Sequence, residues 1–253
     1  MLRSGNPALK DSTFLDLSTG SVVSRSGEAM TLNGTVNKTG LLLFLAVLTA
    51  AFAWNSVQVG PDSVSANFGL YLWCGLIGGL VFAVATIFKA NWAPVTAPLY
   101  ALFEGLFLGA VSAVYDARFD GIVLQAVMLT GGTLFALLMA YRSGLVRATE
   151  NFKLGVTAAT GGIALIYLAT IVLGLFGIRM PYLHESGLIG IGFSLFVVVI
   201  AALNLVLDFD FIESGVEQGA PKHMEWYGAF GLMVTLVWLY LEFLRLLSKL
   251  QSR

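Results

Sequence analysis

The run GLIGIGFSLFVVVIAALNLVL, residues 187–207, decides the fold, because it holds no charged side chain over its whole length. An α-helix needs about 20 predominantly apolar residues to cross the hydrocarbon core of a bilayer. A soluble domain carries about a quarter charged residues, whereas this chain of 253 residues is 11% charged and 57% hydrophobic, with a mean hydropathy of +0.83. The run therefore predicts a membrane-spanning helix.

Six further stretches of similar length and character occupy most of the remaining chain. The breaks between most of them are short and hold glycine, proline or aspartate, as turns do. None shows the alternation typical of a membrane barrel strand, and backbone groups inside lipid must be satisfied within the helix. The sequence therefore predicts an all-α polytopic membrane helix bundle with seven transmembrane helices. The expected spans are Leu41–Val57, Phe68–Phe88, Val95–Tyr115, Gly121–Tyr141, Leu154–Phe176, Gly187–Leu207 and Trp226–Leu247.

The distribution of lysine and arginine predicts which helix ends face the cytoplasm. With residues 1–38 as a cytosolic N-terminal tail and 39–250 as the seven-helix transmembrane domain, the outer loops carry only Arg118 and Arg179. The chain end breaks this pattern if the last segment spans fully, which is the preferred interpretation; a re-entrant last segment is the alternative. The basic residues of the inner side are Arg3, Lys10, Arg25, Lys38, Lys89, Arg142, Arg147, Lys153 and Lys222, and those of the chain end are Arg245, Lys249 and Arg253.

Pairs of glycines predict where helices approach closely. Gly75 and Gly79 in the second span, and Gly105 and Gly109 in the third, have the GxxxG spacing that lets helix backbones come together in a membrane. Tight packing within one chain is the preferred interpretation, and dimerisation through these faces is the alternative.

Charged side chains at membrane depth are costly to bury, so they are candidates for function. Glu104 lies in the third span, Asp208 and Asp210 lie at the end of the sixth, and Glu242 lies within the seventh. Arg245 follows Glu242 by one turn on the same helix face. A salt bridge that merely neutralises both residues is as well supported as any mechanism for that pair.

Asp208 supports two interpretations. It is either an interfacial acid in contact with water or a carboxyl that faces Glu242 across the bundle. Two carboxyls in a dry site cannot both ionise cheaply, so such a pair would share a proton and act as a pH switch. The same oxygens would suit Ca²⁺. The two can meet only if the sixth helix continues to about Glu213 and the seventh begins near Lys222.

Catalysis is not expected of this chain. The two histidines, His184 and His223, fall in loops on opposite sides, so a metalloprotease site with helical histidines is not predicted. Ser194 has no histidine partner inside the bundle, and Lys249 lies at a helix end, where the mid-helix Schiff base of a retinal protein could not form. No cofactor is predicted, and the net charge of −1 gives no sign of nucleic-acid binding.

Several short motifs resemble those of one membrane family. The stretch Trp238–Leu247, WLYLEFLRLL, resembles the closing helix of the transmembrane Bax-inhibitor-motif family. The residues Leu207–Asp210 are similar to the motif that ends its sixth span, and Glu104–Leu106 is similar to its Glu-Gly-Leu element. Arg3–Leu9 and Met30–Thr39 resemble a bacterial YccA-like branch of the family, so the resemblance runs from end to end.

The resemblance implies a seven-span fold with the last helix central, and a pH-sensitive pair of acids that gates a calcium leak. By position the pair is Asp208 and Glu242, which would also be the calcium ligands. The chain departs from the family pattern in having glutamate where the last helix usually has aspartate, Arg245 where asparagine is usual, and an additional acid at Asp210. Some members pair the sixth-helix acid with a base on the second helix, for which only Lys89 is available here.

These observations favour a pH-sensitive cation leak channel, not an enzyme, in a bacterial inner (plasma) membrane. Its partners would be the lipid bilayer and calcium or protons. The alternative is a non-conducting interaction protein that modulates membrane proteolysis or a stress response, with a membrane protease as its partner. Such a protein would act through the tail 1–38 and the segment Phe209–Glu225.

Overall fold

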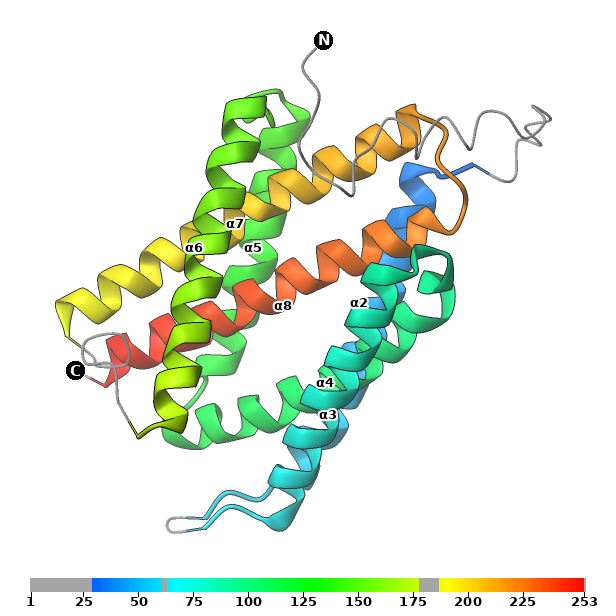
Figure 1. Cartoon of the computed structure of the whole chain (residues 1–253). Helices are drawn as coiled ribbons and strands as arrows, with labels where there is room; N and C mark the ends of the chain where they lie inside the picture. Colours follow the sequence, from blue (N-terminus) through cyan, green and yellow to red (C-terminus); the bar gives the residue numbers. More distant parts are fainter. Residues whose placement is uncertain (1–28, 61–62, 178–186, 253) are drawn as a thin grey trace.

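The computed structural model describes residues 29–60, 63–177 and 187–252, and within these residues the fold is all-α (Figure 1). Seven of the described helices are long and apolar enough to cross a membrane, which confirms the predicted fold class. They are α2 (Leu32–Ser56), α3 (Ala66–Phe88), α4 (Ala93–Arg118), α5 (Ile122–Arg142), α6 (Glu150–Leu175), α7 (Leu188–Glu217) and α8 (Met224–Gln251), with a single 3-10 turn, η1 (Ala90–Trp92), before α4.

The first helix begins earlier than hydropathy predicts. The α2 helix starts at Leu32 rather than Leu41, so the last part of the predicted tail 1–38 is helical. Thr31 caps it, because its hydroxyl accepts a hydrogen bond from the N–H of Gly34 at 3.0 Å. The hydroxyls of Thr35 and Thr39 donate to carbonyl oxygens one turn back at 3.0 Å each, so these polar side chains are satisfied within the helix.

The last two helices extend beyond the predicted spans. The α7 helix runs on past Leu207 to Glu217, and α8 is one unbroken helix of 28 residues that begins at Met224. Both conditions for bringing Asp208 near Glu242 are therefore met as far as helix length is concerned. The length and continuity of α8 also support a full span over a re-entrant segment.

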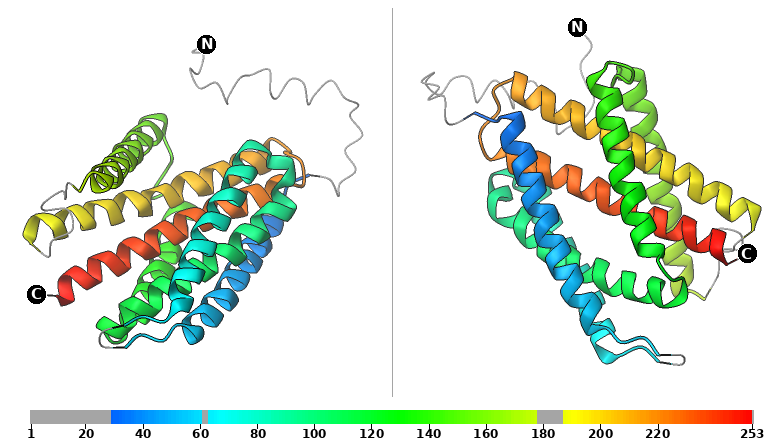
Figure 2. Two further views of the ribbon diagram at one scale, coloured as in Figure 1. Left: turned by 60° about the horizontal axis from the view of Figure 1, so that its bottom comes forward. Right: turned by 180° about the vertical axis from the view of Figure 1, so that it is seen from behind.

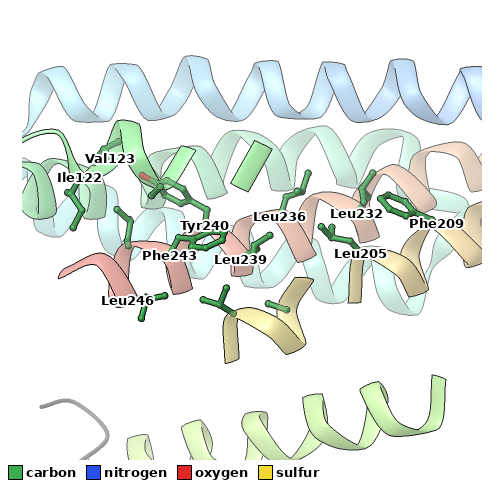
Figure 3. Packing of buried hydrophobic residues seen from close by; sticks show 14 residues of the cluster. Ile122, Val123, Leu205, Phe209, Leu232, Leu236, Leu239, Tyr240, Phe243 and Leu246 are labelled. Atoms are coloured by element: carbon green, nitrogen blue, oxygen red, sulfur yellow. The ribbon is translucent and has the colours of Figure 1, made fainter. Parts of the chain in front are cut away.

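The last helix is central, as the family resemblance implied. It contacts α2, α4, α5 and α7, and 67% of its most apolar window is buried, compared with 11% for α6. Figures 1 and 2 show α8 passing through the bundle between α7 and the group formed by α2, α3 and α4. Along it runs the main apolar core, to which α5 contributes Ile122 and Val123, α7 contributes Leu205 and Phe209, and α8 contributes Leu232, Leu236, Leu239, Tyr240, Phe243 and Leu246 (Figure 3).

Both GxxxG pairs pack helices of the same chain together. A Cβ atom on Gly105 would lie 2.0 Å from the hydroxyl of Thr49 on α2, and one on Gly109 would lie 2.2 Å from the carbonyl oxygen of Ala50. On α3, a Cβ atom on Gly75 would lie 2.5 Å from a backbone nitrogen of α4. The preferred interpretation, tight packing within the chain, is confirmed.

The helix ends gather into two groups. We call the end that holds Thr31 and Met224 the tail end, and the end that holds Arg118 and Gln251 the far end. At the tail end, the N–H of Met30 donates to the carbonyl oxygen of Ala220 at 2.7 Å, which joins the start of α2 to the α7–α8 connection.

Candidate functional site

Asp208 is a buried acid whose hydrogen bonding is incomplete. It lies on α7 and faces α8, where a Cβ atom on Gly231 would be 3.9 Å from its Oδ1 and the hydroxyl of Thr235 is within hydrogen-bonding reach. Its Oδ2 is buried and, among the described residues, has no hydrogen-bond partner. Native structures leave few buried polar atoms in this state, so each one calls for an explanation.

Glu242 has a complete set of partners. Its side chain is 1% exposed, and Nη1 of Arg245 donates to both of its oxygens, at 2.7 and 3.0 Å. The hydroxyl of Tyr167 on α6 donates to Oε1 at 2.8 Å, and the Arg245 guanidinium lies over the Tyr167 ring, 5.0 Å from its centroid. The neutralising salt bridge considered for Glu242 and Arg245 is therefore present.

The predicted pair of Asp208 and Glu242 is not formed. Asp208 lies level with Thr235, and Glu242 follows Thr235 by about 10 Å along the helix at 1.5 Å per residue. The register of α7 and α8 is fixed at the far end, where Nζ of Lys249 donates to the hydroxyl of Ser194 at 2.9 Å. In this antiparallel register Ala201, rather than Asp208, lies level with Glu242. Helix length allowed the contact, and register prevents it.

The other predicted site residues also lie apart. Asp210 forms an ion pair with Lys153 of α6 at 2.8 Å. The carboxyl of Glu104 lies against α3, where the missing side chain of Gly79 makes room for it; a Cβ atom there would be 2.7 Å from Oε2.

The expected basic partner and metal ligands are not assembled either. Nζ of Lys89 lies 4.2 Å from the ring centroid of Trp92 rather than beside Asp208. Within the described ranges, no group of three or more histidine, cysteine, aspartate or glutamate side chains could hold a metal ion. The predicted calcium ligands, Asp208 and Glu242, are separated, so calcium would have to be a passing ion rather than one held by this pair.

Glu225 was missed as a site residue by the sequence reasoning. Its side chain is 0% exposed and pairs with Lys222 at 2.8 Å and with Lys38 of α2. The backbone N–H and the hydroxyl of Thr31 donate to its Oε1 at 2.9 and 2.8 Å. Glu225 therefore connects the first turn of α8 to the start of α2. One sequence feature could have indicated Glu225. It is an acid in the first turn of α8, where it complements the helix dipole, and it follows a lysine by three residues.

Changing Glu225 to glutamine is expected to lower the free energy of unfolding by about 2 kcal/mol, because two lysines lose their charged partner. Thermal unfolding in detergent measures the change. Glu150→Gln is the matched control: that side chain is 92% exposed and its contact with Lys153 is 3.5 Å, so its loss should have little effect. Equal stability of Glu225→Gln and the parent would contradict a stabilising role.

The remaining polar candidates have structural partners or lie elsewhere. Lys249 is 5% exposed, and its Nζ donates to the carbonyl oxygen of Gly190 at 3.0 Å as well as to Ser194. His223 lies in the α7–α8 connection, where burial lowers its pKa, so it takes up a proton only at more acidic pH than an exposed histidine does. His184 and Arg179 fall outside the described residues.

Comparison with known proteins gives one match. A family model described as Bax inhibitor 1 like matches residues 6–252, nearly the whole chain. No match was found among curated proteins or among solved structures.

Proposed function

The chain belongs to the Bax inhibitor 1-like family, and we propose that it is a pH-sensitive cation leak channel with calcium as the ion that the family resemblance implies. The observation that carries the proposal is the buried Oδ2 of Asp208, which has no hydrogen-bond partner in the described part of the chain. In this proposal the gate is one carboxyl rather than the carboxyl pair expected from the sequence.

A buried carboxyl oxygen without a donor can gain a partner in two ways. When the group is protonated, it donates a hydrogen bond itself, and when it is ionised, it attracts a cation. Protons and cations therefore compete for Asp208. Gly231 of α8 leaves the space beside the Asp208 carboxyl free of a side chain. A change in the charge of this carboxyl therefore acts directly on the contact between α7 and α8.

We propose that the tail end faces the cytoplasm and that the membrane is a bacterial inner membrane. The positive-inside rule supports the orientation, because more of the described cations lie at the tail end than at the far end, which has Arg118, Arg245 and Lys249. The tail-end cations are Lys38, Lys89, Arg142, Arg147, Lys153 and Lys222.

We propose further that the protein is not an enzyme and that it needs no cofactor. In support, the hydroxyl of Ser194 lies at the far end of the bundle and His223 at the tail end, so the two do not form a serine–histidine pair. Of the buried acids of α8, Glu225 is held in an ion pair with Lys38 of α2, and Glu242 is held in an ion pair with Arg245 of α8 itself.

One observation favours the alternative, a non-conducting protein that modulates membrane proteolysis together with a membrane protease. The two segments through which it would act meet at the tail end. Ala29 and Pro221 form an isolated antiparallel bridge, and Met30, 2% exposed, packs against Gly215 and Gly228 of α7 and α8.

Calcium flux into liposomes that hold the purified full-length protein, measured from about pH 5 to 8, tests conduction. Protein-free liposomes and a variant that lacks residues 1–28 are compared with the parent. A channel is expected to conduct with or without this segment, because the proposed gate lies between α7 and α8. Flux at the protein-free level throughout this pH range would overturn the channel and leave the alternative.

A further inference from the structure

A cavity of about 260 Å³ lies at the far end, between the last turns of α4 and α8. Three of the described residues that line it are basic, and no carboxylate is among them. The polar residues that line it are Tyr115 and Arg118 of α4, Arg245, Ser248 and Lys249 of α8, and Ser252.

The positive charge around the cavity is not fully balanced. Arg118 forms no ion pair within the described residues. Glu242 and Tyr167 bind Arg245 through Nη1, so the Nε and Nη2 donors of the guanidinium are not used by this pair. Lys249 adds a third cation to the lining. Arg118 therefore brings to the cavity a positive charge that is not neutralised by an ion pair within the described residues.

The chemistry of this lining suits a phosphate group. Guanidinium groups present several N–H donors in a fixed fork that matches phosphate oxygens, and the hydroxyl of Tyr115 adds a further donor. A second cavity of about 570 Å³ shares Arg118 and Val114 with the first and continues beneath the loop that follows α2. The combined space exceeds the needs of one inorganic ion and accommodates a polar group attached to the phosphate.

We propose that the cavity at the ends of α4 and α8 is a binding site for a phosphate group, carried by an anionic lipid headgroup or by a small soluble phosphate. The position favours the lipid, because Arg118 and Ser252 lie at helix ends, where headgroups are found. Occupation would place an anion beside Arg245 and would share this residue with Glu242. The inference goes beyond the proposed channel and does not depend on it.

The test measures binding rather than flux, so it is independent of the channel proposal. The full-length protein is extracted into micelles that contain equal amounts of phosphatidylglycerol and phosphatidylcholine, and native mass spectrometry counts retained lipid. Arg118→Gln removes a cation without breaking an ion pair among the described residues. Arg118→Lys keeps the positive charge but removes the guanidinium with its fixed arrangement of N–H donors. Arg142→Gln is the matched control, since Arg142 is also an exposed arginine in the last turn of a helix, at the opposite end.

The expected result is preferential retention of phosphatidylglycerol by the parent and by Arg142→Gln, about tenfold weaker retention by Arg118→Gln, and an intermediate value for Arg118→Lys. A second arm adds inorganic phosphate or glycerol phosphate to protein in phosphatidylcholine alone and follows thermal unfolding. Stabilisation that depends on Arg118 in this arm, without lipid retention, would assign the site to a soluble phosphate. Equal behaviour of all variants in both arms would overturn the site.

Discussion

Replacing Arg245 with alanine is expected to lower the free energy of unfolding by about 3 kcal/mol, because it leaves Glu242 buried without its cation. Glu242 is 1% exposed, and both of its oxygens accept hydrogen bonds from Nη1 of Arg245. The same nitrogen donates to the hydroxyl of Tyr167, so the substitution also weakens the polar link between α6 and α8. Equilibrium unfolding in mixed micelles of detergent and dodecyl sulfate measures the loss.

A double variant provides the matched control for this prediction. Arg245→Ala combined with Glu242→Gln removes the orphaned charge together with the cation, and it should recover more than half of the lost stability. Arg142→Ala removes an exposed arginine that forms no ion pair among the described residues, and it should leave stability nearly unchanged. If Arg245→Ala alone were as stable as the parent, the buried carboxylate would not depend on Arg245.

Adding a methyl group at Gly109 is expected to cost about 3 kcal/mol or to prevent folding, because overpacking here cannot be relieved by rotating a side chain. The new Cβ atom would lie 2.2 Å from the carbonyl oxygen of Ala50 and 2.8 Å from its Cα, both backbone atoms of α2. The loss of contact between α2 and α4 would appear as a lower midpoint in the same unfolding assay.

Gly162→Ala on α6 is the control for the Gly109 variant. Apart from its chain neighbours and the backbone of its own helix, no described heavy atom lies within 4 Å of a Cβ atom built at Gly162. Alanine is a better helix former than glycine, so this variant should be as stable as the parent or more so. The same loss in both variants would show that the effect is not caused by close packing of α2 against α4.

Most of the fold could be predicted from the sequence because the bilayer imposes strong constraints on composition. Runs such as residues 187–207 are too long and too apolar for other structures, and glycines at GxxxG spacing marked the contacts of α3 and α4 correctly. The start of α2 was placed too late, because hydropathy does not identify residues 32–38 as part of the helix. Their helix depends on a threonine cap and on hydroxyls bonded to the backbone.

The contacts of the candidate site were harder to predict, because they depend on the register between helices. Asp208 and Glu242 belong to helices that do pack together, yet a shift of about two turns separates their side chains. Local spacing was informative only where both partners share a helix, as Glu242 and Arg245 do. Glu225 was missed since two of its partners, Thr31 and Lys38, lie nearly two hundred residues away.

The measurement that tests the single-carboxyl gate most directly is the pH response of calcium flux in liposomes that hold Asp208→Asn. Asp210→Asn is compared in parallel, because it removes a neighbouring acid that is already paired with Lys153. Asparagine cannot exchange a proton in this range, so we predict that Asp208→Asn conducts at a rate that no longer depends on pH, whereas Asp210→Asn keeps the pH response of the parent. An unchanged pH response in Asp208→Asn would contradict the assignment of Asp208 as the gate.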